Sequence, residues 1–241
     1  MDRDSARMLA WERLREVALP DSRFHLDFSM YIPDYPGSDQ IPDALRALSF
    51  YGGTGPVFVT PDNNLEVMRA NFLREGRPLL ITTYGISRGF VYFPPGSVPG
   101  ASVEFAASLD GAERFGAHYD LAAIQSLGQL DFLVTGASAV NRDGIRFGKG
   151  HGYFDLEWAI LRDLGMVDER TPVVACVHDV QYLDEEMDAR PTDSLVDWIV
   201  TPSRTIEVSR KQTKPRGIDW DQLDPAMLES IPVLRALKAR A

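Results

Sequence analysis

Three glycines at alternate positions mark residues 146–155 as a candidate anion-binding loop. Gly148, Gly150 and Gly152 remove every second side chain from this short stretch, which permits positive φ angles and lets backbone N–H groups converge on one point. Such a concavity at the start of a helix attracts phosphate oxygens, because the amides and the helix dipole both favour negative charge. The spacing therefore predicts a phosphate site.

Charged side chains on the same segment support this interpretation. Arg146 and Lys149 bring two positive charges into a chain whose formal net charge is −10. Because the overall field repels anions, an anionic ligand has to be held by such a local cluster. Asp155 stands where the loop enters a predicted helix, and it either caps that helix or holds a Mg²⁺ ion that bridges phosphates.

The segment matches neither of the two common phosphate loops. No Ser or Thr follows Lys149, as G-x-x-x-x-G-K-[ST] requires, and the glycine spacing is not G-x-G-x-x-G. A flexible hinge loop with a capping Asp155 is the alternative interpretation. The density of glycine beside two cations favours the anion-binding interpretation over the hinge loop.

Bulk composition places the chain among ordinary globular proteins. Of its 241 residues, 44% are hydrophobic and 25% are charged, which excludes disordered and fibrous classes. The acidic balance repels phosphate backbones, so we predict no nucleic-acid partner.

Cys176 is the single cysteine, and its apolar neighbours predict a buried, unreactive thiol. A charged start and the lack of any apolar run of about 20 residues predict a cytoplasmic protein with no membrane association.

Alternating strands and helices are expected to position the loop. Apolar, β-branched runs predict strands at 57–60, 78–83, 89–93, 130–136, 173–177 and 196–201. Helical spacing and stop signals predict helices at 5–17, 42–48, 62–76, 155–164 and 224–241, with Asp62 or Asn63 capping the third. This order predicts an α/β fold with a mostly parallel sheet and helices on both faces. We expect one domain over 1–241, its smaller half (about 1–100) packed on the nucleotide-site half (101–241).

Candidates outside the loop are weaker. None of His25, His118, His151 and His178 forms a metal-ligand spacing, and only His151 lies in the loop. Further pocket candidates, each with a surface or core role as the alternative, are Arg69, Tyr84, Arg88, His178, Asp179 and Trp198.

The glycine segment resembles the signature R-x-G-x-G-x-G-Y-Y-D of the 5-formyltetrahydrofolate cyclo-ligase family. A basic N-terminal helix, a strand ending Val134-Thr135-Gly136 and a late segment at 193–202 occur in the same order as in that family. The resemblance runs from Arg3 to Val208. It implies an α/β fold akin to the sugar-isomerase and CoA-transferase superfamily.

The resemblance also implies a reaction with ATP and Mg²⁺. In the family, ATP phosphorylates the formyl oxygen of 5-formyltetrahydrofolate, the neighbouring nitrogen closes the ring, and phosphate leaves. Arg146, Lys149 and Tyr153 are the implied catalytic residues, with Tyr153 near the folate and Asp155 on Mg²⁺. The implied nucleotide-binding residues are Arg3, Arg7, Arg146, Phe147, Gly148, Lys149, Gly150, His151, Gly152, Tyr153 and Asp155.

Departures from the family pattern indicate a divergent paralogous branch. Arg3 and Arg7 stand where a Lys and an Arg are usual, and Leu156-Glu157 follow Asp155 where the family has Arg directly after the Asp. Thr192 stands where His is common. The leading hypothesis is a cyclo-ligase acting on a folate, as a monomer or homodimer. The alternatives are a non-catalytic paralog that binds nucleotide or folate, and a ligase of the same logic on another substrate.

Overall fold

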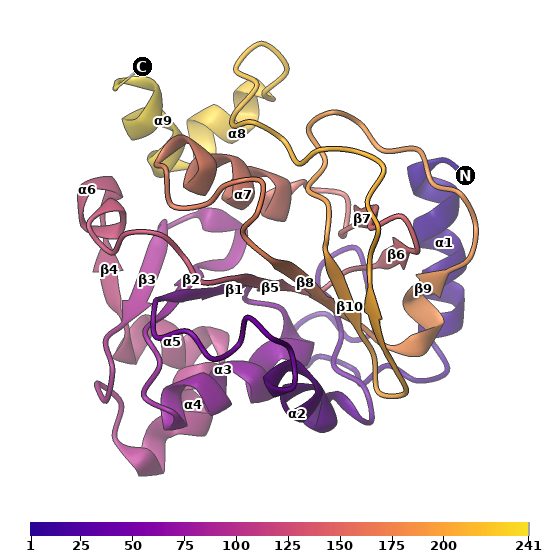
Figure 1. Ribbon diagram of the computed structural model, residues 1–241, viewed down its shortest axis with the longest axis horizontal. Helices are drawn as coiled ribbons and strands as arrows, with labels where there is room; N and C mark the ends of the chain where they lie inside the picture. Colours follow the sequence, from indigo (N-terminus) through magenta and orange to yellow (C-terminus); the bar gives the residue numbers. More distant parts are fainter. Residues whose placement is uncertain (241) are drawn as a thin grey trace.

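Apolar runs of the sequence form the centre of an eight-stranded sheet in the computed structural model, which describes residues 1–240 (Figure 1). The strand order across this sheet is β11-β10-β8-β5-β1-β2-β3-β4. In chain order its strands are β1 (Val57–Val59), β2 (Leu79–Thr82), β3 (Phe90–Phe93), β4 (Ala117–Tyr119), β5 (Leu133–Thr135), β8 (Val173–Cys176), β10 (Trp198–Val200) and β11 (Thr205–Glu207).

Most of the sheet is parallel, as the sequence predicted. Strands β10, β8, β5, β1 and β2 run in one direction, and all except β10 are fully buried along their length. The edges differ from the expectation: β3 and β4 at one side and β11 at the other pair antiparallel. Because β1 lies between β5 and β2, one sheet contains strands from both predicted halves of the chain.

Helices cover both faces of this sheet, and every strand except the edge strands β4 and β11 packs on both. Val57 and Val59 pack into one core cluster while Phe58 packs into the opposite one, because successive side chains of a strand point to opposite faces. The helices on the first face are α2 (Ile41–Arg46), α3 (Glu66–Arg74), α4 (Val103–Ala107) and α5 (Leu109–Phe115). Those on the second face are α6 (Leu121–Gln125), α7 (Tyr153–Asp163), α8 (Pro225–Ser230) and α9 (Pro232–Lys238).

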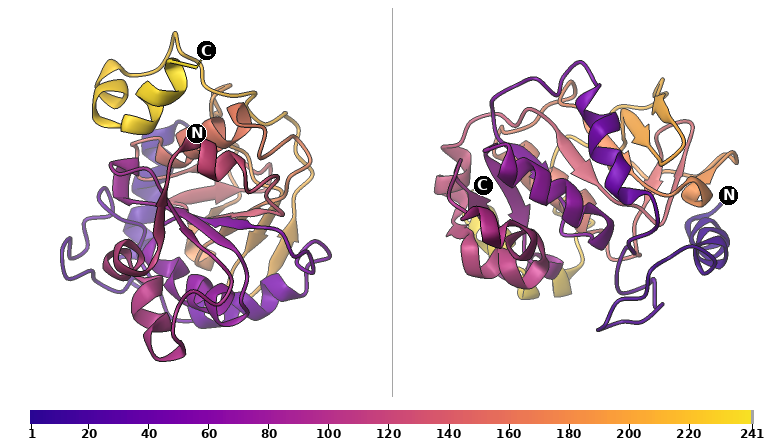
Figure 2. Two further views of the ribbon diagram at one scale, coloured as in Figure 1. Left: turned by 90° about the vertical axis from the view of Figure 1, so that its left-hand side faces the viewer. Right: turned by 90° about the horizontal axis from the view of Figure 1, so that it is seen from below.

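A second, three-stranded sheet carries the start of the glycine segment. It consists of β6 (Ala139–Asn141), β7 (Arg146–Phe147) and β9 (Tyr182–Leu183), and the sequence analysis did not predict it. Helix α1 (Arg3–Leu14) packs against all three strands at the margin of the molecule (Figures 1 and 2). The N-terminal helix is therefore brought beside a loop almost 150 residues further along the chain.

Two predicted helices have different ends or caps in the structure. The single helix expected at 224–241 is divided into α8 and α9, because Pro232 disfavours helical geometry at Ile231, whose φ and ψ are −106° and 102°. The last residue of that prediction lies outside the described residues. The helix expected from 62 begins at Glu66, and Asp62 makes no capping hydrogen bond to it.

Candidate functional site

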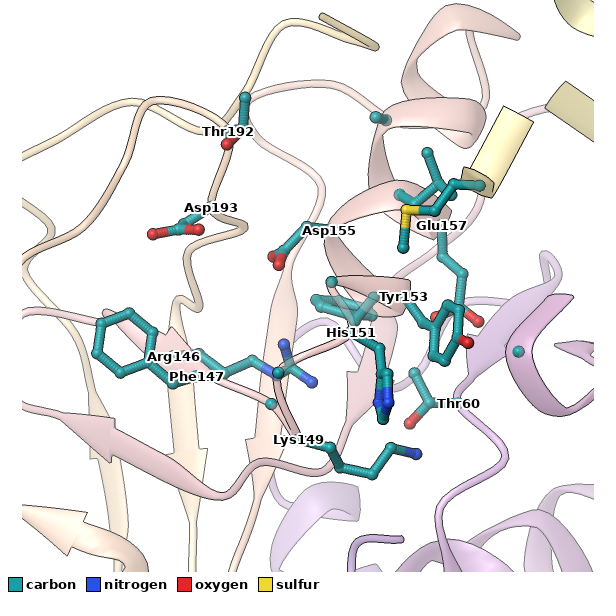
Figure 3. Close-up of a pocket in the computed structure, with 18 of the residues that line it drawn as sticks. Thr60, Arg146, Phe147, Lys149, His151, Tyr153, Asp155, Glu157, Thr192 and Asp193 are labelled. Atoms are coloured by element: carbon teal, nitrogen blue, oxygen red, sulfur yellow. The ribbon is translucent and has the colours of Figure 1, made fainter. Parts of the chain in front are cut away.

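The glycine segment forms part of the wall of a cleft of about 440 Å³ (Figure 3). Further lining residues come from the segment 24–32, from Leu109, from α7 and from four more parts of the chain. These four parts are α1, the ends of β1 and β2 with the loops that follow, the loop at 190–193, and the C-terminal stretch 217–227. The cleft lies beside the carboxyl ends of the parallel strands β1 and β2, where open α/β sheets commonly place ligands.

Glycine is needed at the three positions for two different structural reasons. Gly150 and Gly152 have φ values of 116° and 70°, which disfavour residues with a side chain. Gly148 has no positive φ, but a Cβ atom built there would lie 3.2 Å from an Arg146 guanidinium nitrogen. The first glycine therefore leaves room for Arg146, and the other two let the backbone turn into α7.

Backbone donors of the segment are free to bind a ligand. From Gly148 to Asp155, no backbone N–H group donates to an acceptor within residues 1–240. Gly152 is the N-cap of α7 and has no side chain that could accept from the first-turn N–H groups. These N–H groups and the positive end of the dipole of this 11-residue helix therefore face the cleft. This arrangement has the geometry that the sequence predicted for an anion cradle, and anion binding itself stays a prediction.

Arg146 is the most deeply buried cation of the segment, with 6% of its surface exposed. Its Nε donates to the carbonyl of Gly136 at 2.8 Å, and its guanidinium lies 4.7 Å from the centre of the Phe154 ring. It therefore ties together the loop after β5, strand β7 and the first turn of α7. The same side chain lines the cleft.

Two arginines in the first half of α1 contact the segment or the residues beside it. Arg7 Nε donates to the carbonyl of Gly148 at 2.8 Å, and Arg3 forms an ion pair with Asp193. Both guanidinium groups lie over the ring of Phe147, at 5.1 Å for Arg3 and 5.8 Å for Arg7. The structure thus brings the predicted N-terminal arginines and the glycine segment into one site.

Aromatic contacts organise the remaining residues of the loop. Lys149 Nζ lies 5.2 Å from the centre of the Tyr84 ring, and His151 stacks on Tyr153 with ring centres 5.2 Å apart. Burial lowers the pKa of His151, and the charges of Lys149 and Arg7 act in the same direction. His151 therefore faces the cleft as a neutral imidazole at pH 7.

Asp155 occupies the first turn of α7 but does not cap it. One of its oxygens accepts a hydrogen bond from the backbone N–H of Ser194 at 2.8 Å, which holds the 190–193 loop at the cleft. Burial raises the pKa of this carboxyl, and Arg146 partly opposes the shift. The capping interpretation is therefore wrong, and the magnesium interpretation stays a prediction.

Glu157 is the cleft residue whose chemistry the sequence did not reveal. Its side chain is 2% exposed, and its Oε1 accepts a hydrogen bond from the hydroxyl of Thr82 at the end of β2. Burial raises its pKa to about 8. The nearby Asp62 adds to that shift, whereas Arg146 and Lys149 oppose it. Glu157 is therefore mostly uncharged at neutral pH.

Asp62 also lines the cleft, in a role that differs from the predicted helix cap. Its Oδ2 accepts hydrogen bonds from the Thr60 hydroxyl at 2.6 Å and from the backbone N–H of Gly136 at 3.0 Å. The loops after β1 and β5 are thereby joined. A Cβ at Gly136 would lie 2.9 Å from the same oxygen, so this glycine permits the approach.

Of the weaker candidates, only Tyr84 lines the cleft. Arg69 is 1% exposed and donates to the backbone carbonyls of Ala107, Thr60 and Asp62, so it is neither a surface residue nor a ligand-binding one in this structure. The others lie outside the cleft lining among residues 1–240. Arg88 and His118 pair with Glu113, and Trp198 packs on Phe50. His178 accepts a hydrogen bond from the backbone N–H of Val180, and Asp179 accepts one from the Thr201 hydroxyl. His25 is the last of this group.

Several residues of the cleft could not be predicted as site residues from the sequence. Phe24 and Tyr31 come from the irregular segment before α2, and Phe24 stacks on Tyr84 with centres 6.0 Å apart. The opposite wall, including Ile218, Gln222 and Met227, is held in place because Trp158 Nε1 donates to the carbonyl of Pro215 at 3.0 Å. Neither stretch has a motif, so only the tertiary structure reveals them.

Two further features bear on the predicted partners. Residues 1–240 contain no group of three or more His, Cys, Asp or Glu side chains arranged to hold a metal ion. Every helix in the described part of the chain is too short or too polar to cross a lipid bilayer.

Comparison with known proteins places this site in a family. Residues 56–202, which include β1, the glycine segment and β10, match the 5-formyltetrahydrofolate cyclo-ligase family. The chain belongs to this family. The resemblance inferred from the glycine segment is confirmed, and with it membership of a ligase family of folate and one-carbon metabolism.

Relatives of the chain agree with a divergent branch of the cyclo-ligase family. The human methenyltetrahydrofolate synthase domain-containing protein is 37% identical over 216 residues, which cover 87% of this chain and 55% of the human protein. The 5-formyltetrahydrofolate cyclo-ligase of Mycolicibacterium smegmatis is 34% identical over 86 residues, 36% of this chain and 41% of that protein. The chain therefore spans little more than half the length of its human relative.

A solved structure confirms the fold of this cyclo-ligase family member. The NMR structure of Aquifex aeolicus 5,10-methenyltetrahydrofolate synthetase superposes with a TM-score of 0.52 at 14% sequence identity, covering 87% of this chain and 94% of that one. This likeness bears out the α/β fold with its mostly parallel sheet. The analogy to the sugar-isomerase and CoA-transferase superfamily stays a prediction.

Replacing Glu157 with Gln is expected to make folding less dependent on pH. A carboxyl whose pKa rises from 4.5 to about 8 on folding contributes stability below pH 4.5 that is lost as the pH rises to 8. The free energy of unfolding of Glu157→Gln relative to the parent protein should therefore increase by about 4 kcal/mol between pH 5 and 8. Urea denaturation at several pH values measures this difference.

The exposed Glu207 on β11 provides the control for the loss of one negative charge. A difference between Glu157→Gln and the parent that stays constant from pH 5 to 8 would show that Glu157 is ionised in the folded protein.

Proposed function

We propose that the protein is an ATP- and Mg²⁺-dependent cyclo-ligase that converts 5-formyltetrahydrofolate to 5,10-methenyltetrahydrofolate with release of ADP and phosphate. The observation that carries the proposal is the run of unpaired backbone N–H groups from Gly148 to Asp155, opening onto the cleft beside Arg7, Arg146 and Lys149. Family membership supports the reaction class.

The residues around the cradle suit phosphoryl transfer to a formyl oxygen. This chemistry needs charge neutralisation and alignment more than a protein nucleophile. The loop amides and Lys149 bind phosphate oxygens, while Arg146 is fixed by Gly136 and Phe154 and needs no rearrangement to contribute its charge. Tyr153 reaches across the cleft, where its hydroxyl would lie 3.2 Å from a Cβ at Gly85, and so limits the space for the folate.

Asp155 fits a role in holding Mg²⁺. One carboxylate oxygen is bound by Ser194, and the other makes no hydrogen bond within residues 1–240. Magnesium typically takes one or two carboxylates and completes its shell with water and substrate phosphates, so a single free carboxylate beside a phosphate cradle suffices. When bound, the ion would neutralise charge on the phosphates of the nucleotide.

Turnover is the direct test of the proposed function. Purified protein with ATP, Mg²⁺ and 5-formyltetrahydrofolate should produce the absorbance of the methenyl-folate product together with ADP in equal amounts. No product at high concentrations of folded protein would contradict the proposal. Tight binding of both ligands by calorimetry in that case would support a non-catalytic paralog, and ATP consumption with other small acids or amides would support a different substrate.

Lys149→Ala should weaken ATP binding by about tenfold or more, because a charge-assisted contact to phosphate contributes about 1.5–3 kcal/mol. Calorimetry with ATP and Mg²⁺ measures the dissociation constant. Lys211→Ala is the matched control, since Lys211 pairs with Asp143 and lies outside the cleft lining in the described residues. Equal affinities for the two variants would place the nucleotide away from the glycine segment.

Asp155→Asn should abolish the dependence of ATP binding on Mg²⁺ and leave the fold intact, because Asn retains the acceptor for Ser194 but not the negative charge. Titration of ATP with and without Mg²⁺ measures the effect, and a thermal melt checks the fold. Asp219→Asn removes a carboxylate from the opposite wall of the same cleft and serves as the control. Unchanged Mg²⁺ dependence in Asp155→Asn would limit this residue to positioning the 190–193 loop.

A further inference from the structure

Glu157 has an unused acceptor that faces the cleft. The Thr82 hydroxyl occupies Oε1, and neither a hydrogen bond nor an ion pair engages Oε2 within residues 1–240. Oε2 keeps a small solvent-accessible area, although the residue as a whole is only 2% exposed. Since Glu157 lines the cleft, Oε2 opens onto it.

The side chain is held in place before any ligand arrives. It projects from the second turn of α7 across to the end of β2, where Thr82 is fully buried. Figure 3 shows Glu157 and Tyr153 both leaving this helix toward the cleft. A buried, oriented polar group of this kind selects a ligand that satisfies it and rejects an analogue that does not.

Flat rings surround the same end of β2. The Tyr153 hydroxyl lies against Gly85, three residues after Thr82, and Tyr84 between them stacks on Phe24. Aromatic faces bind flat heterocycles by stacking, and the carboxyl beside them takes a hydrogen bond from a group on the edge of such a ring. An amino group attached to the ring can donate to Oε2 of the Glu157 carboxylate.

We propose that Glu157 is a specificity-determining residue that accepts a hydrogen bond from the amino group of a flat, nitrogen-containing ring bound in the cleft. The inference rests on the proposed function for its ligands, because both the pterin ring of the folate and the adenine ring of ATP carry such an amino group. Thr82 is the residue that positions the Glu157 carboxyl.

Binding measurements with paired ligands test this inference without requiring turnover. One pair is 5-formyltetrahydrofolate and its 2-desamino analogue, and the other is ATP and inosine triphosphate, in which oxygen replaces the amino group. The parent protein should prefer the amino ligand of one pair by about tenfold or more, as expected for a hydrogen bond to a buried acceptor. The pair that shows the preference identifies the ring.

Variants then show whether Glu157 is responsible. Glu157→Leu removes the acceptor and should bring the preference close to one, Thr82→Val should reduce it, and Glu207→Leu on the exposed face of β11 should retain it. A general structural defect changes both ligands of a pair equally, so the ratio isolates recognition of the amino group. If thermal melts show that Glu157→Leu does not fold, Thr82→Val carries the test.

The outcomes separate this inference from the proposed function. A preference that persists in Glu157→Leu, or no preference in either pair, would overturn the role of Glu157 even if the protein turns over 5-formyltetrahydrofolate. A preference lost in Glu157→Leu without turnover would uphold the recognition and contradict the cyclo-ligase activity.

Discussion

The buried guanidinium of Arg146 is the interaction on which the rest of the site depends. It bonds to Gly136 after β5, extends from β7 and lies on Phe154 in the first turn of α7, so three elements are fixed by one side chain. A charge with 6% exposure requires such partners, because an unsatisfied buried cation costs far more than its bonds return. Its bulk in turn accounts for glycine at 148, where a Cβ would come within 3.2 Å.

The chain concentrates positive charge locally while remaining acidic overall. Arg3, Arg7 and Arg146 converge on Phe147 and the loop, yet Asp193 already neutralises Arg3, and Asp4 pairs with Arg7. The charge left for a ligand is therefore modest, and the unpaired amides of the loop carry much of the attraction for an anion. This balance favours a phosphate chain held along the backbone over a single ion held by side chains.

The fold and the glycine site could be predicted because their determinants are local. Runs such as Val57–Val59 and the spacing of Gly148, Gly150 and Gly152 are visible in a few consecutive residues. The edge strands, the small sheet of β6, β7 and β9, and the cleft wall at 217–227 depend on contacts between distant segments and carry no such pattern. Asp62 and Asp155 illustrate the same limit, since both have the spacing of helix caps but bond to backbone groups of other loops, at Gly136 and Ser194.

Glu157 shows how a residue that weakens the fold can reveal function. Placing a carboxyl on the buried side of α7 raises its pKa, which means that folding disfavours its charged form. An apolar side chain of similar size would avoid this cost, and one hydrogen bond from Thr82 does not offset it. Because the second oxygen opens onto the cleft and not into the core, a bound molecule can supply a further hydrogen bond there. The departure from the family signature therefore coincides with the part of the cleft where we propose that Glu157 recognises a ligand.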